Sequence, residues 1–401
     1  MIEIQQALDL IESQCVTLPA DDLDLIRLPG HVLAESLESD VDSPPFDKSM
    51  MDGFALQTAD VSSGHACLQV LAQVQAGTQF SGQVGSGQSV QIMTGAPVPQ
   101  GADAVVMVEQ TRHTENQVEI QATVKAGQNI LRRGTAMRAG QTIISSGVRV
   151  RAEDVGLLAE AGTVSAKVIP RPCLSVIATG DELIPVESSP TGSQIRNSNG
   201  PMIACLAEPH CEAVRDLGVG PDSVETLAEV VRVGLQSDVL VLSGGVSAGV
   251  ADLVPAVLQQ LGVRQIFHKV KIKPGKPVWF GVYESEAKKR TLVFGLPGNP
   301  VSSMVCFRVF VLPALLRLAG RDGLSAYGSG KLSAEFRQRP GRTTYWPSRV
   351  TQSETGCLLE PLDWKGSADL RTLAQANCYT VFTGEKDQFV PGETLPFLHM
   401  N

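Results

Sequence analysis

The sequence predicts a multidomain protein built around a doubly wound, mostly parallel α/β domain. Apolar strand-like runs alternate with helix-like segments between residues 172 and 319, as in successive βα units. Short alternating strands separated by glycines come before and after this region, and they indicate β structure. The 401 residues are too many for one hydrophobic core. We therefore expect an N-terminal helical segment, an inserted small β domain, the α/β domain and a C-terminal β domain.

The N-terminal part predicts two interleaved domains. Helical spacing of apolar residues covers 4–15, and we expect further helices at 30–37 and 153–161. The proline-rich stretch 43–54 is interpreted as a loop, and short strands follow from 54 to about 135. Since the helix at 153–161 is expected to rejoin the first two, we place a discontinuous helical domain at 1–42 and 137–170, with the β domain inserted at 43–136.

The remaining chain predicts the α/β domain at 171–323 and a β domain at 324–401. In the α/β domain we expect strands at 173–179, 212–217, 239–242, 267–272 and 291–295, and helices at 201–208, 223–235, 253–261 and 300–319. In the last domain we expect strands at 331–336, 343–350, 357–359 and 379–383 around a short helix at 368–376.

Composition narrows the functional classes. The formal net charge of −9 argues against broad binding to nucleic acid. Eight cysteines without a C-x-x-C pair favour free thiols in a reducing cytoplasm over disulfides or structural zinc. The N-terminus lacks the basic start and apolar core of a signal peptide. The apolar segment 304–319 contains Arg308, Pro313 and Arg317, so we interpret it as a core helix and expect no membrane association.

Three predicted strand ends are polar and rich in glycine: ATGDEL (178–183), SGGVSAGVAD (243–252) and GLPGNPVSS (295–303). Ligands of doubly wound sheets bind beyond the carboxyl ends of the strands, where these segments would meet. In the third segment, Asn299 suits an N-cap and Pro300 the first helical position. The amides of the next residues, with the hydroxyls of the two following serines, would then form an anion site. The alternative is a well-capped helix without a ligand.

Lysines gather in KVKIKPGKPVWFG (269–281). On a strand, Lys271 and Lys273 share a face, and the turn at Pro274-Gly275 returns Lys276 close to them. These lysines could simply guard an exposed strand edge. Two prolines restrict Lys276, however, which favours a site that fixes an oxyanion.

Three acids lie near these basic groups, and each has a structural alternative. Asp252 could be a helix N-cap, Asp222 begins a capping-box pattern, and Glu182 could be an acid in a first helical turn. Acids beside lysines would repel a phosphate unless a cation such as Mg²⁺ bridged them. Neither a P-loop nor a dinucleotide-binding glycine motif is present in the sequence. The pattern therefore favours a phosphate-bearing ligand with bound Mg²⁺.

Seven motifs together resemble one family, the molybdopterin molybdenumtransferases, which are related to the gephyrin E domain. The motifs span most of the chain in order: SPPFDKSMMDGFAL, IMTGAPVPQGADAVVMVE, IATGDEL, IRNSNG, LSGGVSAGVAD, IKPGKPVWFG and GLPGNPVSS. The resemblance implies a four-domain, elongated homodimer whose α/β domain is of the molybdopterin-binding type. It implies insertion of molybdate into adenylylated molybdopterin, with Mg²⁺ as cofactor and AMP as product. Other proteins of molybdenum cofactor biosynthesis are further possible partners.

The resemblance also implies roles for individual residues. Catalytic roles fall on Asp52, Glu182, Asp222, Asp252, Lys273 and Lys276, and Asp222 and Asp252 would bind the metal. Substrate contacts fall on Thr94, Ser243, Gly244, Gly245, Ser247, Pro297, Asn299, Pro300, Ser302, Arg342 and Ser367. Since the family pocket lies between subunits, Asp52 and Thr94 would face the α/β domain of the partner chain.

The chain departs from the family pattern at a few positions. Ala136 replaces a usual aspartate, Met50 and Phe54 replace alanine and tyrosine, and Val250 stands where a polar residue is frequent. Ala136 leaves open a weaker or non-catalytic paralogue. Two other functions stay open at this point: adenylylation of molybdopterin, which resides on a similar α/β domain alone, and a scaffold that clusters partners. The sequence does not distinguish molybdate from tungstate.

Overall fold

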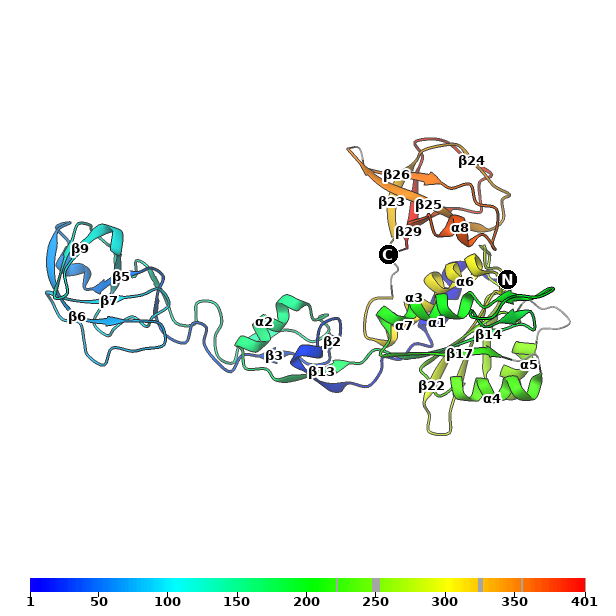
Figure 1. Ribbon diagram of the computed structural model, residues 1–401, viewed down its shortest axis with the longest axis horizontal. Coiled ribbons are helices and arrows are strands. Elements are labelled where there is room, and N and C mark those ends of the chain that lie inside the picture. Colours follow the sequence, from blue (N-terminus) through cyan, green and yellow to red (C-terminus); the bar gives the residue numbers. More distant parts are fainter. Residues whose placement is uncertain (221–222, 247–252, 324–326, 355, 401) are drawn as a thin grey trace. The chain divides into compact units, whose positions relative to one another are not determined.

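The computed structural model describes all residues except 221–222, 247–252, 324–326, 355 and 401. The chain forms two compact units (Figure 1). One unit comprises Met1–Asp21 and Ile169–Asn401, and the other comprises Asp22–Val168. The family-derived boundaries between four domains stay predictions.

The smaller unit is built mainly from β structure. Its six-stranded sheet has the order β8-β5-β7-β6-β10-β9. These strands are β5 (Gly53–Leu56), β6 (Ala66–Val74), β7 (Gln88–Ile92), β8 (Ala104–Met107), β9 (Thr111–His113) and β10 (Gln117–Ile120). Phe54 and Leu56 pack into one apolar cluster and Ala55 into another, so both faces of the inner strand β5 are buried. The predicted inserted β structure is therefore present.

The helix predicted at 30–37 is wrong. That segment contains two short strands, β2 (Val32–Leu33) and β3 (Leu37–Glu38). The first joins a sheet with β13 (Ser165–Ile169), and the second pairs with β12 (Thr142–Ile144). Pairing with distant strands thus overrides the local pattern. The helix predicted at 153–161 is present as α2 (Ala152–Glu160).

The larger unit contains the predicted α/β sheet, with the strand order β17-β14-β18-β22-β21-β19. The strands are β14 (Cys173–Thr179), β17 (Ala213–Gly220), β18 (Val239–Ser243), β19 (Arg264–His268), β21 (Trp279–Glu284) and β22 (Arg290–Leu296). The first four in the sheet order are parallel, β21 runs antiparallel to them, and β19, which is antiparallel to β21, returns to their direction. The chain leaves β14 first to one side and then to the other, which creates a switch point between β14 and β18.

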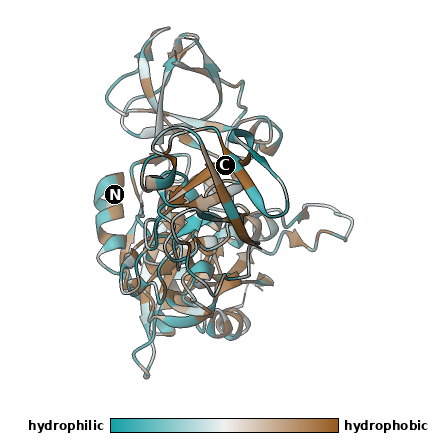
Figure 2. Cartoon of the chain, turned by 90° about the vertical axis from the view of Figure 1, so that its left-hand side faces the viewer, coloured by the Kyte–Doolittle hydropathy of each residue, from teal (hydrophilic) through white to brown (hydrophobic). Residues whose placement is uncertain are grey.

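Helices cover both faces of this sheet. The helices α1 (Ile4–Glu12), α3 (Asn199–Ala207), α6 (Pro300–Cys306) and α7 (Leu312–Leu318) contribute to one core, and α4 (Val224–Gly234) and α5 (Leu253–Gln260) to the other. The central strand shows the alternation, because Val239 and Val241 pack on one face and Leu240 and Leu242 on the other. Figure 2 shows α1, near the N label, with mixed hydrophobic and hydrophilic surfaces, as an amphipathic helix requires.

The long helix predicted at 300–319 is interrupted. A π-helical segment at Phe307–Val311 separates α6 from α7. Pro313 lacks the N–H that would donate to the carbonyl four residues earlier, which accounts for a change of hydrogen-bond pattern here. Pro300–Leu318 is long and apolar enough to cross a membrane, yet 78% of its apolar window is buried inside the protein. It is therefore a core helix, as predicted.

The C-terminal sheet has the order β20-β25-β26-β23-β29-β27, and a further pairing of β25 with β27 closes it. Its strands are β20 (Ile272–Lys273), β23 (Tyr327–Leu332), β25 (Thr343–Ser353), β26 (Gly356–Pro361), β27 (Cys378–Phe382) and β29 (Thr394–His399). The short strand β20 comes from the α/β part of the chain and pairs in parallel with β25. This pairing joins the lysine-rich turn to the C-terminal domain. The predicted short helix is α8 (Leu370–Leu373).

Candidate functional site

Three strand ends meet at the carboxyl edge of the α/β sheet, as the sequence predicts. The hydroxyl of Thr179, at the end of β14, donates to the carbonyl of Ser243, at the end of β18, over 3.4 Å. The amide of Gly244 donates to the carbonyl of Leu296, at the end of β22, over 3.0 Å. Gly244 has φ +100°, and a Cβ atom there would lie 2.3 Å from the carbonyl oxygen of Thr179. Only glycine permits this close approach.

A polar hollow of about 470 Å³ lies at the switch point between β14 and β18, and we call it the switch-point pocket. Its lining includes four residues predicted for the site: Glu182, Ser243, Asn299 and Pro300. Its other lining residues are Thr179, Leu183, Ile195, Arg196, Asn197, Ser198, Asn199, Gly298, Ala368 and Leu370. Polar groups and aliphatic side chains together suit an organic ligand with hydrogen-bonding edges.

Asn199 lines this pocket and was not identified from the sequence. Asn199 is 8% exposed and begins α3. Its Nδ2 group donates to the carbonyl of Gly298 over 2.7 Å and to the hydroxyl of Ser243 over 2.8 Å. Asn199 therefore links α3 to the loops after β18 and β22. The motif IRNSNG pointed to this segment, but the sequence does not show which of its side chains turns inward.

A second hollow of about 470 Å³ surrounds the lysine-rich turn, and we call it the lysine pocket. It brings together five residues predicted for the site from four separate parts of the chain: Lys273, Lys276, Ser302, Arg342 and Ser367. The rest of its lining is Pro274, Gly275, Pro277, Trp346, Trp364, Lys365 and Gly366. Several cations and two hydroxyls in one concave site suit a small anion.

The lysine-rich turn is fixed on two sides. Strand pairing aligns Lys273 with Thr344 of β25. The amide of Val270 donates to the carbonyl of Lys276 over 3.0 Å. Gly275 has φ +115° and packs so closely on the buried thiol of Cys306 that a Cβ atom would lie 2.4 Å from its Sγ. Both lysines are therefore presented from a closely packed turn.

The lysine pocket gathers positive charges whose mutual repulsion a bound anion would relieve. Desolvation, followed by the neighbouring charges of Arg342 and Arg339, lowers the pKa of Lys273. Lys271, predicted to share the face of Lys273, instead forms an ion pair with Glu3 and does not line the pocket. Lys365 is paired with Asp363 over 2.6 Å at the exposed rim.

One wall separates the two pockets. It consists of the first turn of α6 and the segment 365–370, which contribute residues to both linings. The amide of Val301 donates to the carbonyl of Ser367 over 3.0 Å. This amide was predicted to be free to bind an anion, and that part of the prediction is wrong. Asn299 and Pro300 do occupy the N-cap and first helical positions, although the Asn299 side chain makes no capping bond. Gly244, Gly245 and Pro297 lie in the adjoining turns and line neither pocket.

Asp52 and Thr94 are neighbours in the smaller unit. Asp52 Oδ1 accepts hydrogen bonds from the Thr94 amide over 2.7 Å and the Thr94 hydroxyl over 2.8 Å. These two bonds, the amide first, lower the pKa of the Asp52 carboxyl group. Asp52 is therefore an exposed carboxylate held in one orientation. Its proposed position opposite the α/β domain of a partner chain stays a prediction.

Three predicted residues, Asp222, Ser247 and Asp252, lie outside the described residues. The N-cap of α4 is Ser223, whose hydroxyl accepts from the Thr226 amide over 3.3 Å. The alternative in which a capping box begins at Asp222 is therefore wrong. Glu182 precedes the short strand β15 (Leu183–Ile184), so the interpretation as an acid in a helical turn is wrong. Within the described part of the chain, no group of three or more His, Cys, Asp and Glu side chains is arranged to hold a metal ion.

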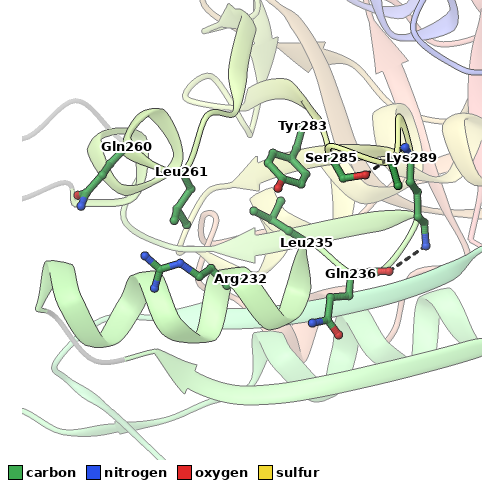
Figure 3. A pocket seen from close by; sticks show the side chains of 9 residues that line it. Arg232, Leu235, Gln236, Gln260, Leu261, Tyr283, Ser285 and Lys289 are labelled. Atoms are coloured by element: carbon green, nitrogen blue, oxygen red, sulfur yellow. Dashed lines mark hydrogen bonds between the residues drawn. The ribbon is translucent and has the colours of Figure 1, made fainter.

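A further hollow of about 660 Å³ lies at the opposite, amino edge of the sheet. Figure 3 shows Arg232, Gln236, Tyr283 and Lys289 around it, and Lys289 donates to the carbonyl of Gln236 over 2.9 Å. None of the residues predicted for the site lines this hollow.

The fold and the two pockets define a class: an α/β protein that places a polar pocket beside a cationic pocket. Comparisons with known proteins show the family. Residues 2–162 match the MoeA N-terminal region (domain I and II), residues 175–317 a "probable molybdopterin binding domain", and residues 329–400 the MoeA C-terminal region (domain IV). The chain belongs to the molybdopterin molybdenumtransferase family, whose members act in molybdenum cofactor biosynthesis.

Individual relatives match almost the whole chain. A molybdopterin molybdenumtransferase of Staphylococcus aureus (strain COL) is 31% identical, and the match covers 99% of this chain and 95% of the relative. One from Staphylococcus epidermidis (strain ATCC 12228) is 31% identical, with coverage of 98% and 94%. A solved MoeA structure from Pyrococcus horikoshii OT3 is 25% identical, with a TM-score of 0.81 over 100% of both chains. A second such structure is 27% identical, with a TM-score of 0.86 over 100% of this chain and 99% of the other.

Proposed function

We propose that this protein inserts molybdate into adenylylated molybdopterin and releases AMP. The observation that carries the proposal is the shared wall between the lysine pocket and the switch-point pocket, because it would hold an oxyanion beside an organic substrate. Membership of the molybdopterin molybdenumtransferase family supports this choice of substrates. Catalysis would rest on positioning and on charge stabilisation, as in other phosphoryl chemistry.

In this proposal the lysine pocket receives molybdate. Lys273, Lys276 and Arg342 would neutralise the dianion, and the hydroxyls of Ser302 and Ser367 would donate to its oxygens. The lowered pKa of Lys273 supports this assignment, because a bound anion would offset the desolvation and the like charges around the ammonium group.

The switch-point pocket would receive part of adenylylated molybdopterin. Ser243, Asn299 and Pro300 line it, and Glu182 places a carboxylate at its wall. The position beyond the carboxyl ends of β14 and β18 is where doubly wound proteins bind their ligands. Asp52, held by Thr94, would complete the site from the other subunit of a homodimer.

Mg²⁺ is the proposed cofactor. Its proposed ligands Asp222 and Asp252 lie outside the described residues, and Glu182 is the one carboxylate among the described residues that line the switch-point pocket. Oxygen donors of this kind suit Mg²⁺, but a single carboxylate is not a complete site. When bound, Mg²⁺ would polarise the phosphoanhydride that links AMP to the pterin. We also place the protein in the cytoplasm, where molybdopterin substrates would be available.

In the decisive experiment the protein is mixed with adenylylated molybdopterin and Mg²⁺, and the release of AMP is measured with and without molybdate. Molybdate-dependent release supports insertion. Release that is independent of molybdate, or turnover that requires ATP and free molybdopterin with pyrophosphate as product, would overturn the proposal in favour of another activity.

Asp252→Asn tests the metal assignment separately. Asparagine is also a good N-cap, so the melting temperature should change little while Mg²⁺-dependent AMP release falls steeply. Full activity of this variant at physiological Mg²⁺ would remove Asp252 from the metal site.

A further inference from the structure

Asn199 combines three features in the switch-point pocket. It lines the pocket, it is 8% exposed, and its Oδ1 atom has no hydrogen-bond partner in the described structure. A buried acceptor without a partner costs free energy, because the water that it lost on folding is not replaced. A ligand that brings a donor to this atom would recover that cost.

The orientation of the Asn199 amide follows from its neighbours. The carbonyl oxygen of Gly298 can only accept, so the group that faces it over 2.7 Å must be the Nδ2 donor. The Ser243 hydroxyl, at 2.8 Å from Nδ2, is compatible with this orientation. Exchanging the two amide atoms would place two acceptors against each other. Oδ1 is therefore the atom left without a partner.

We infer that Asn199 Oδ1 accepts a hydrogen bond from a donor group on the organic substrate and thereby helps to select that substrate. The donor is an N–H group of a flat heterocycle that enters the switch-point pocket. Thr179 and Ser198 offer further neutral polar groups, and Leu183 and Leu370 offer aliphatic surface for a ring. The inference rests on the proposed function in one respect, since it takes adenylylated molybdopterin as the source of the heterocycle.

Adenylylated molybdopterin carries two such heterocycles, the pterin and the adenine. The chemistry that Asn199 recognises is shared by both, because each presents amine or ring N–H donors at its edge. Matched pairs of ligands distinguish them. AMP is compared with purine riboside 5′-monophosphate, which lacks the amine, and pterin is compared with 2-dimethylamino-3-methylpterin, which lacks the donors of the pyrimidine edge.

The experiment measures equilibrium binding of the four ligands to the full-length protein and to Asn199→Ala. In the unmodified protein, removing the ligand donor should weaken binding about fivefold to tenfold in one of the two pairs. In Asn199→Ala the same removal should change binding less than about twofold, because the acceptor is gone. The pair that shows this coupling identifies the heterocycle.

Asn197→Ala is the matched control. Asn197 is also buried and lines the pocket, but its Oδ1 already accepts from the Gly200 amide over 3.0 Å. This variant should keep the discrimination between donor and donor-free ligands. If Asn199→Ala does not fold, Asn199→Ser serves instead, since its shorter side chain keeps a hydroxyl beside Ser243 but removes the Oδ1 acceptor, so the discrimination should fall in the same way.

Two outcomes would overturn the inference: neither pair shows discrimination in the unmodified protein, or Asn199→Ala discriminates as strongly as the unmodified protein. Both are binding measurements, so they do not depend on turnover. If Asn199→Ala abolishes the discrimination while AMP release does not depend on molybdate, Asn199 still accepts a hydrogen bond from the heterocycle, and the proposed insertion reaction is wrong.

Discussion

At the scale of single residues, the sequence predicted which residue types form the site better than it predicted which side chains point into a pocket. The five predicted residues of the lysine pocket do come together, because charged and hydroxyl side chains at strand ends and turns are visible in the sequence. Asn199 was missed, because the inward direction of one asparagine depends on where Gly298 and Ser243 lie in the folded sheet. Its unsatisfied acceptor exists only in three dimensions.

Lys273 should make molybdate binding sensitive to pH. Only the ammonium form attracts the dianion, and the pKa of Lys273 is lowered by desolvation and by Arg342. Affinity is therefore fully present below this pKa and is lost as pH rises through it, at a lower pH than for an ordinary lysine. Titration calorimetry with molybdate between pH 7 and 10 would measure the loss.

Lys273→Arg provides the control for this pH dependence. Its guanidinium stays charged throughout the range, so affinity should be weaker overall but flatter with pH. An unmodified protein whose molybdate affinity is already independent of pH over this range would contradict the role of Lys273.

Thr94 should hold Asp52 in its ionised form. Thr94→Val removes the hydroxyl donor at 2.8 Å but keeps the backbone amide, so the pKa of Asp52 should rise only part of the way toward its ordinary value. Stability linked to Asp52 is present above its unfolded-state pKa and lost as pH falls through the folded-state pKa, so this loss should shift to higher pH. NMR titration of the carboxyl group measures the shift, and Thr94→Ser should leave it unchanged.

At the scale of elements, the buried strands of the α/β sheet could be predicted, whereas the strands that depend on pairing with distant segments could not. The strands β14, β18 and β22 were predicted within one or two residues, because long buried apolar runs dictate them. The two-residue strands β2 and β3 owe their conformation to distant partners, so the sequence around them predicted a helix instead. The strands β21 and β29 were also missed, since each is defined by antiparallel neighbours.

The lysine-rich turn should tolerate no side chain at Gly275. A Cβ atom there would lie 2.4 Å from Cys306 Sγ, so Gly275→Ala should destabilise the protein by about 1–3 kcal/mol beyond backbone strain alone. Molybdate affinity should fall with it, because the turn carries both lysines. Chemical denaturation and calorimetry measure the two effects.

Gly356→Ala is a matched control for this variant. Gly356 has φ +113°, close to the +115° of Gly275, but no described atom lies within 4 Å of the position of its Cβ. It should therefore report backbone strain without a clash, and Cys306→Ala should partly restore Gly275→Ala. Equal destabilisation by both glycine substitutions would show that packing on Cys306 is unimportant.

At the scale of the whole molecule, the residues proposed for the site are divided between the two units of the chain. The two pockets belong to the larger unit, whereas Asp52 and Thr94 belong to the smaller one. A symmetric dimer could bring the smaller unit of one subunit to the larger unit of the other, and it would then form two equivalent sites. This arrangement makes a prediction that a site within one chain does not share.

Two inactive variants should complement each other if each site is built from two subunits. Asp52→Ala damages the contribution of the smaller unit, and Lys276→Ala damages the lysine pocket. In a mixed dimer both defects fall in one site and the other site is intact. Random exchange of subunits at equal concentrations should therefore restore about one quarter of the unmodified rate of AMP release. If confirmed mixed dimers stay inactive, Asp52 acts within its own chain and the proposed position across the interface is wrong.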